Sequence, residues 1–88
     1  MRNHILKCHP QYFHAVKDGS KNFEFRNNDR GFKVDDVVIL REYDPITSLF
    51  SGDEIFIKIT YILDDFIGMK QGWCVFSFKR IDNLSLDD

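Results

Sequence analysis

The alternating segment at residues 54–63 limits the possible folds of this chain more than any other feature. Isoleucine stands at positions 55, 57 and 59, and Tyr61 and Leu63 continue the same alternation. Because successive side chains of a strand point to opposite faces, this spacing predicts a strand with one fully apolar face. A β-sheet is therefore expected at the centre of the fold.

Four shorter segments also have the composition of strands, at residues 4–8, 22–26, 37–43 and 73–80. Each contains β-branched, aromatic or alternating apolar residues, and turn-forming residues separate them. The β-branched run that opens the third segment predicts a central strand covered on both faces. The stretches at 45–52 and 64–72 contain glycine or proline and are expected to be loops.

One short helix is expected between the first two strands. Pro10 is favoured in a first helical turn, and Tyr12, Phe13 and Val16 fall on one face. Gly19 should end the helix in a left-handed conformation. A helix of about two to three turns is too short to persist alone, so it should be held by packing.

This order of elements predicts an α+β, mainly β fold. We expect a small, partly closed antiparallel barrel with the early helix packed over one opening. The 88 residues have room for one domain, expected over residues 4–81, with an acidic, loose tail at 82–88. We expect most of these aromatic residues to lie in the core: Phe23, Phe25, Phe32, Tyr43, Phe50, Phe56, Tyr61, Phe66, Trp73, Phe76 and Phe78. One or two near a cleft could stack on a base, and Phe32 and Trp73 are the candidates because each adjoins a glycine loop.

Charge is unevenly distributed along the chain, although the net charge is only −2. Residues 1–41 carry eight Lys and Arg against five Asp and Glu, or +3, whereas residues 42–88 carry four against nine, or −5. The basic half could face an anion, or the folded surface could mix the two signs. A protein that binds nucleic acid by nonspecific backbone attraction is usually more basic.

The two cysteines give no sign of a disulfide framework or a metal site. Cys8 and Cys74 form no CxxC motif, and no stretch resembles a secretory leader, so we expect reduced thiols and a cytoplasmic protein. If both lie on one strand, His4 and Cys8 are about 13 Å apart, which is too far for both to bind one metal ion. We therefore expect no metal and no cofactor.

No apolar run approaches the roughly 20 residues that span a bilayer, so no membrane partner is expected. The sequence leaves the oligomeric state open.

A candidate site for a polar ligand lies at Lys21, Glu24 and Arg26, followed by Arg30 and Lys33. Glu24 and Arg26 share one face of the predicted strand, and Lys21 could join them from the turn. A carboxylate between two cations stays ionised and can accept a hydrogen bond from a base, while the cations can hold phosphate. The same spacing also fits exposed strand charges of little energetic weight.

A family resemblance strengthens the functional interpretation of this segment. Residues 19–26, GSKNFEFR, match the GxKxxExR signature of ASCH domains in full. Residues 28–36 resemble a segment of one small ASCH-related family of unassigned function, as do residues 40–45, residues 59–63 and the glycine–tryptophan approach to the last strand. The resemblance covers about residues 4–79. ASCH domains resemble PUA domains, which are β-barrels that bind RNA, so it implies a cleft lined by the signature residues.

Two of the three hypotheses for function place a ligand in that cleft. In the first, the domain is a binding module for RNA or a nucleotide. Lys21, Arg26, Arg30 and Lys33 contact phosphates, and Glu24 meets a base or fixes the cations.

The second hypothesis is an amidohydrolase acting on modified nucleosides. Some small ASCH members hydrolyse acylated cytidine nucleosides with the motif lysine, a threonine and a separate glutamate. Lys21 matches the lysine, but Glu24 occupies the threonine position. In this enzyme Lys21 would be a general base with a lowered pKa and Glu24 a proton shuttle.

The third hypothesis is a protein-interaction domain without a nucleotide ligand. One further departure from the family pattern lies at Val34-Asp35-Asp36, where relatives often have glycine and then aspartate. We expect this difference to alter a turn more than the site.

Overall fold

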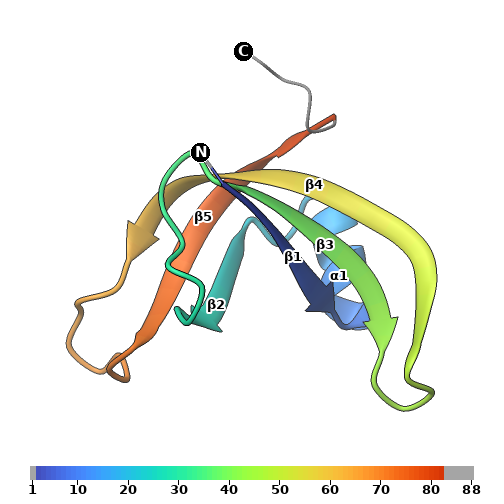
Figure 1. Ribbon diagram of the computed structural model, residues 1–88, viewed down its shortest axis with the longest axis horizontal. Coiled ribbons are helices and arrows are strands. Elements are labelled where there is room, and N and C mark those ends of the chain that lie inside the picture. The colour runs from blue at the N-terminus through green and yellow to red at the C-terminus, as the bar shows by residue number, and fades with distance from the viewer. Residues whose placement is uncertain (1, 83–88) are drawn as a thin grey trace.

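The computed structural model describes residues 2–82, which form five strands curled into a half-barrel with one short helix (Figure 1). Residues 83–88 of the predicted tail lie outside the described residues. The mainly β class with an early helix is confirmed. In chain order the elements are β1 (Asn3–Cys8), α1 (Pro10–Lys17), β2 (Phe23–Asn27), β3 (Val37–Asp44), β4 (Leu49–Leu63) and β5 (Trp73–Ile81).

Residues 2–82 form one mixed sheet with the strand order β1-β3-β4-β5-β2. The β3–β4, β4–β5 and β5–β2 pairs are antiparallel, as expected. The β1–β3 pair is parallel, and here the expectation of an antiparallel barrel is wrong. The chain crosses through α1 and β2 before it enters β3, and a crossover of this length lets two strands run in the same direction.

Strand β4 begins earlier than the sequence predicts. The expected loop at 45–52 is shorter, because the strand already starts at Leu49 rather than at Glu54. Tyr43 pairs with Phe50 across the β3–β4 hairpin, and their ring centres lie 4.9 Å apart. Cross-strand aromatic pairs of this kind stabilise a sheet and extend the hairpin beyond the core.

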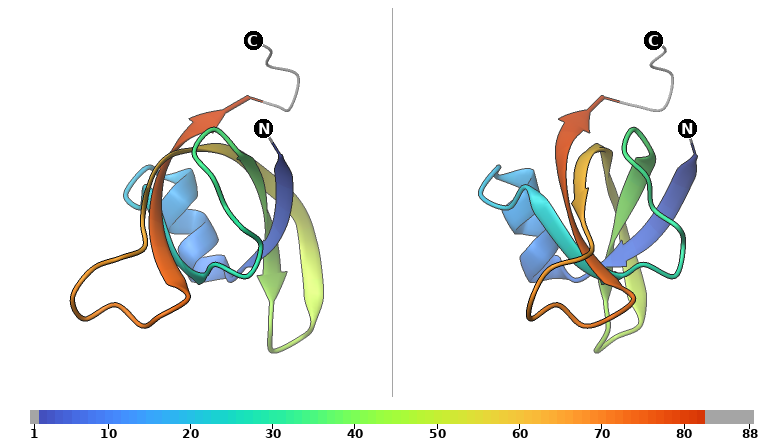
Figure 2. Two further views of the ribbon diagram at one scale, coloured as in Figure 1. Left: turned by 60° about the vertical axis from the view of Figure 1, so that its left-hand side comes forward. Right: turned by 90° about the vertical axis from the view of Figure 1, so that its left-hand side faces the viewer.

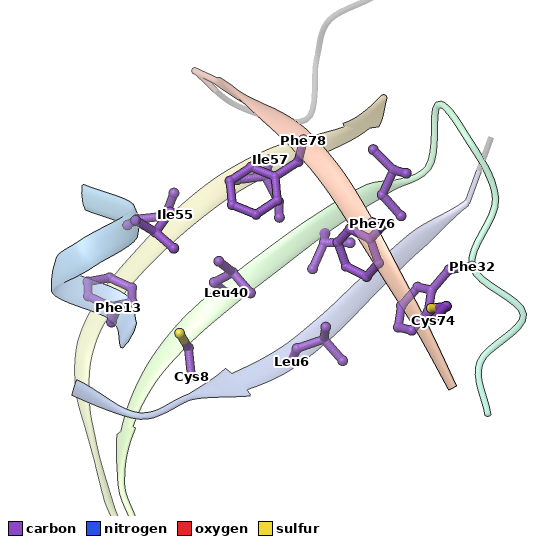
Figure 3. Packing of buried hydrophobic residues seen from close by; sticks show 13 residues of the cluster. Leu6, Cys8, Phe13, Phe32, Leu40, Ile55, Ile57, Cys74, Phe76 and Phe78 are labelled. Atoms are coloured by element: carbon purple, nitrogen blue, oxygen red, sulfur yellow. The ribbon is translucent and has the colours of Figure 1, made fainter. Parts of the chain in front are cut away.

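The core fills the concave side of the half-barrel (Figure 3). The predicted apolar face of β4 supplies Ile55, Ile57 and Ile59, all almost fully buried. Phe13 and Val16 of α1 are equally buried and belong to the same cluster, and no side chain caps the helix N-terminus. The helix is therefore held by packing, as its length predicts.

The expectation that most of the aromatic residues are in the core is wrong. Of the eleven aromatic residues named above, only Phe32, Phe76 and Phe78 are buried. Five others are about half exposed or more: Phe23, Phe25, Phe50, Tyr61 and Phe66. The aliphatic side chains of the core come mostly from β3 and β4: Val38, Leu40, Ile55, Ile57 and Ile59. On β2 the buried position is taken by Glu24, so Phe23 and Phe25 fall on the opposite, exposed face.

Asp36 ties the start of β1 to the start of β3. Its buried carboxylate accepts hydrogen bonds from His4 Nε2 at 2.8 Å, the Arg2 N–H at 3.1 Å and the Lys33 N–H at 3.0 Å. Burial by itself raises the pKa of Asp36, but these hydrogen bonds outweigh it and the pKa is lowered. The preceding Asp35 has φ 79°, a left-handed conformation that glycine adopts at less cost than aspartate. The Val34-Asp35-Asp36 departure thus lies in a turn, as expected, and this turn carries the buried, hydrogen-bonded carboxylate of Asp36.

We predict that Asp36→Asn lowers the free energy of unfolding by about 1–3 kcal/mol at pH 7, because it leaves buried donors poorly paired. The folded-state pKa of Asp36 lies below the unfolded value of about 3.9. Its stabilisation is therefore present above that value and is lost as the pH falls through the folded-state pKa. Urea unfolding at a series of pH values should show the difference from the wild type narrowing below about pH 4.

The matched control is Asp53→Asn, because Asp53 is exposed on β4. It should change stability little at any pH. A gap between the wild type and Asp36→Asn that stays constant from neutral to acid pH contradicts this account of Asp36.

Candidate functional site

A cleft of about 830 Å³ lies between the two edge strands of the sheet, β1 and β2. These strands stand at opposite ends of the sheet order, and the curl of the sheet brings them toward each other (Figure 2). Residues of β1, α1, the turn after it, β2, the following loop and the start of β5 line it: Leu6, Lys7, Cys8, His9, Tyr12, Ala15, Ser20, Lys21, Phe23, Glu24, Phe25, Arg26, Asn27, Asp29, Arg30, Phe32 and Trp73.

Glu24 lies at the centre of the cleft and is only 4% exposed. Its Oε2 lies 2.5 Å from Lys21 Nζ, and its Oε1 accepts a hydrogen bond from Arg26 Nε at 2.9 Å. The alternation along β2 points Glu24 and Arg26 to the same side, as the sequence predicts. A buried carboxylate is tolerated when, as here, each of its oxygens is paired with a cation and hydrogen-bonded.

The end of α1 positions Lys21. Gly19 has φ 87°, a left-handed conformation that glycine adopts without steric cost, and the Lys21 N–H then bonds to Ala15 O at 3.0 Å. The Lys21 ammonium also donates to Phe23 O at 2.7 Å. Two of its three donors are thus occupied by Glu24 and a carbonyl.

Arg26 of β2 and Arg30 of the loop after it contact β1 directly. Arg26 Nη2 donates to Lys7 O at 2.9 Å, and Arg30 Nη1 donates to Ile5 O at 2.8 Å. Within residues 2–82, β1 and β2 share no backbone pairing, so these guanidinium groups bridge the gap between the strands. A guanidinium has five N–H donors, and each arginine therefore keeps donors for a ligand.

The structure brings four of the five predicted site residues together: Lys21, Glu24, Arg26 and Arg30 all line the cleft. The side chain of Lys33 is exposed and does not line it. Lys7 also borders the cleft, where its carbonyl accepts the hydrogen bond from Arg26, but its ammonium lies 4.4 Å from the centre of the Tyr43 ring, outside the lining. The cleft thus carries the cationic side chains of Lys21, Arg26 and Arg30 and the carboxylates of Glu24 and Asp29.

Aromatic residues border the cleft, among them Phe32 and Trp73, which were expected near it, and Phe23 and Phe25, which were expected in the core. Phe23 and Phe25 are 49% and 54% exposed because Glu24 takes the inward face of β2. Trp73 is half-buried, and its ring centre lies 5.1 Å from that of Phe25. The sequence contains a signal for this exposure, because charged residues that face inward on a short strand require the alternating phenylalanines to face outward.

Cys8 lies beside this cluster but does not have the properties of a nucleophile. Burial, and next the negative charge of Glu24, raises the pKa of Cys8 to about 11. The thiol is therefore protonated at neutral pH, whereas the thiolate is the reactive form. Burial also raises the pKa of Cys74, and both cysteines are free.

The part of the chain that the structure describes contains no group of three or more His, Cys, Asp or Glu side chains arranged to hold a metal ion. Among residues 2–82 there is also no helix with the length and apolar character needed to cross a membrane.

Comparison with known proteins gives a family without an assigned function. A family model described as a domain of unknown function, DUF3850, matches residues 3–78. The chain also resembles an uncharacterized 12.9 kDa protein in the GpA 3′ region of Escherichia phage P2, with 36% identity over 61 residues. This alignment covers 69% of the chain and 54% of the phage protein, so the chain spans about half the length of that curated relative.

We predict opposite effects on the pKa of Cys8 when its two charged neighbours are neutralised. Glu24 raises this pKa and Lys21 lowers it, so Glu24→Gln should lower it and Lys21→Met should raise it. The rate of iodoacetamide alkylation of Cys8, followed by peptide mass spectrometry over a pH series, reports each value. Shifts of the same sign in both variants contradict the described electrostatics.

Proposed function

The chain belongs to the DUF3850 family of domains of unknown function, and we propose that its cleft is the ligand site of an RNA- or nucleotide-binding module. We also propose that the fold is an ASCH-type, PUA-like barrel, on the basis of the GxKxxExR signature at residues 19–26. The free thiols of Cys8 and Cys74 fit a reducing compartment, so the proposed location is the cytoplasm.

The observation that carries this proposal is the paired carboxylate of Glu24 within a cleft walled by aromatic rings. Each oxygen of Glu24 accepts one hydrogen bond from a cation and keeps a further lone pair. Such an oxygen can accept a hydrogen bond from the amino or imino group of a nucleobase. Tyr12 lines the cleft, is 47% exposed, and has its ring centre 5.9 Å from Lys21 Nζ, so it offers a ring on which a base can stack, which is how proteins commonly hold unpaired bases.

The cations around Glu24 suit the phosphate of the same nucleotide. Lys21, Arg26 and Arg30 line the cleft, and the two arginines are held in place by carbonyls of β1. Guanidinium groups that are already fixed lose less side-chain entropy when they bind a phosphate. With few cations and a net charge of −2, binding should be of moderate affinity and only weakly dependent on salt.

The geometry supports binding better than hydrolysis. A general base needs a free lone pair, whereas Lys21 donates to both Glu24 and the Phe23 carbonyl. Glu24 is held at both oxygens by cations, which limits its use as a proton shuttle. Cys8 is a protonated thiol at neutral pH, since its pKa is raised to about 11.

We predict that ribonucleoside monophosphates and short RNA change the fluorescence of Trp73, the only tryptophan of the chain, because Trp73 borders the cleft and a bound ligand alters its surroundings. Lys21→Ala should weaken binding about tenfold to a hundredfold, the usual effect of losing one charge-assisted hydrogen bond. Fluorescence titration at low salt measures both.

The matched control is Lys79→Ala, which removes an exposed lysine of β5 that does not line the cleft. Its affinity should equal that of the wild type. If no nucleotide or RNA binds at low salt, or if both variants bind equally, the proposed function is wrong.

A further inference from the structure

Three arginines stand along the open edge of β1. Arg26 and Arg30 donate to the carbonyls of Lys7 and Ile5, at 2.9 and 2.8 Å. Arg2 Nη2 donates in turn to the carbonyl of Arg30 at 2.6 Å. The edge that would otherwise offer unpaired carbonyls to another strand is therefore a row of positive charges. We call Arg2, Arg26 and Arg30 the cationic edge.

A second hollow, of about 570 Å³, adjoins the cleft on this side. It shares Asp29 and Arg30 with the cleft, so the two hollows are neighbours on either side of these residues. Its lining consists of Arg2, Asn3, His4, Ile5, Asp29 and Arg30. No residue of this second hollow except Arg30 is needed for the binding of a single nucleotide in the cleft.

The arginines of this hollow retain the means to bind an anion. The side chain of Arg2 is 55% exposed, and Arg30 is exposed as well. Among residues 2–82 the hydrogen bond to Ile5 O uses one of the five Arg30 donors. Two carboxylates face the same region: Asp36, 3.9 Å from Arg2 Nε, and Asp29 in the lining. Because Asp36 is buried and hydrogen-bonded, the carboxylate that repels a bound anion most strongly is that of Asp29.

The spacing along β1 matches an extended nucleic-acid backbone. Ile5 and Lys7 are two residues apart, and two residues of a strand span about 6.6 Å. Arg30 and Arg26 bind the carbonyls of Ile5 and Lys7, so their guanidinium groups are staggered by a similar distance along the edge. This stagger is close to the separation of neighbouring phosphates in an extended single strand. The bases of such a strand are free to turn into the cleft, whereas those of a duplex are paired and stacked.

We propose that the cationic edge binds the phosphodiester backbone of an extended single-stranded RNA while one of its bases enters the cleft. The proposal rests on the proposed function and adds the ligand class: an oligonucleotide, with Arg2 as a phosphate contact that the cleft itself does not include. Each phosphate neutralised along the edge adds affinity and adds about −0.7 to the slope of log K against log salt.

The experiment compares a ribonucleoside monophosphate with an RNA tetranucleotide of the same base, by titration followed through amide NMR shifts at several salt concentrations. The tetranucleotide should bind at least about tenfold more tightly, with a steeper salt slope. Arg2→Gln should weaken the binding of the tetranucleotide about threefold to tenfold and make the slope of its log K against log salt shallower by about 0.7. The affinity for the monophosphate should stay unchanged. Arg2→Lys keeps the charge and should retain most of the affinity.

The matched control is Arg80→Gln, because Arg80 makes the same kind of bond, to Lys17 O at 3.0 Å, away from both hollows. It should bind both ligands as the wild type does. The inference is overturned if the tetranucleotide binds no more tightly than the monophosphate, if a duplex of the same length binds better, or if Arg80→Gln and Arg2→Gln have equal effects. Binding of neither ligand overturns the proposed function as well.

Discussion

The carboxylate of Glu24 lies almost entirely out of water and has to be neutralised by groups within the protein. Lys21 and Arg26 do this from the two sides, one from the turn after α1 and one from the next inward position of β2. Because Arg26 also donates to Lys7 O, the ion pairs of Glu24 couple β2 to β1. The residues that define the site are thus also those that hold its two walls together.

This coupling explains why the half-barrel is open yet ordered at its edges. A fully closed barrel would pair β1 with β2 through the backbone and fill the space between them. Here side-chain donors replace that pairing, and a cleft of about 830 Å³ remains between the strands. The signature segment therefore has two roles, the closure of the sheet and the presentation of donors. A substitution within it should be judged by stability and binding together.

Much of the fold was predictable from the sequence, because strand alternation and helix punctuation are local signals. The apolar face of β4 and the helix ending before Gly19 are examples. The parallel β1–β3 pair was not predictable, since strand partners are chosen by the whole sheet. The extension of β4 to Leu49 depends on the Tyr43–Phe50 contact across the hairpin, which is likewise not local.

The site was predictable to a similar degree. The signature spacing placed Lys21, Glu24 and Arg26 together, and their pairing in the structure agrees. The exposure of Phe25 was missed because aromatic residues are usually assigned to the core, although the inward direction of Glu24 settles the opposite face of β2. The roles of Arg26 and Arg30 as braces for β1 depend on contacts 19 and 25 residues apart in the chain, which no local pattern encodes.

Mapping of RNA-induced amide shifts onto the sequence tests the central claim, that the Glu24 cleft is the ligand site, most directly. The account predicts that the shifts concentrate at residues 5–8, 21–27 and 73, which surround the cleft. Shifts concentrated instead at the β3–β4 hairpin, where Ile46 and Phe50 are exposed, would contradict it.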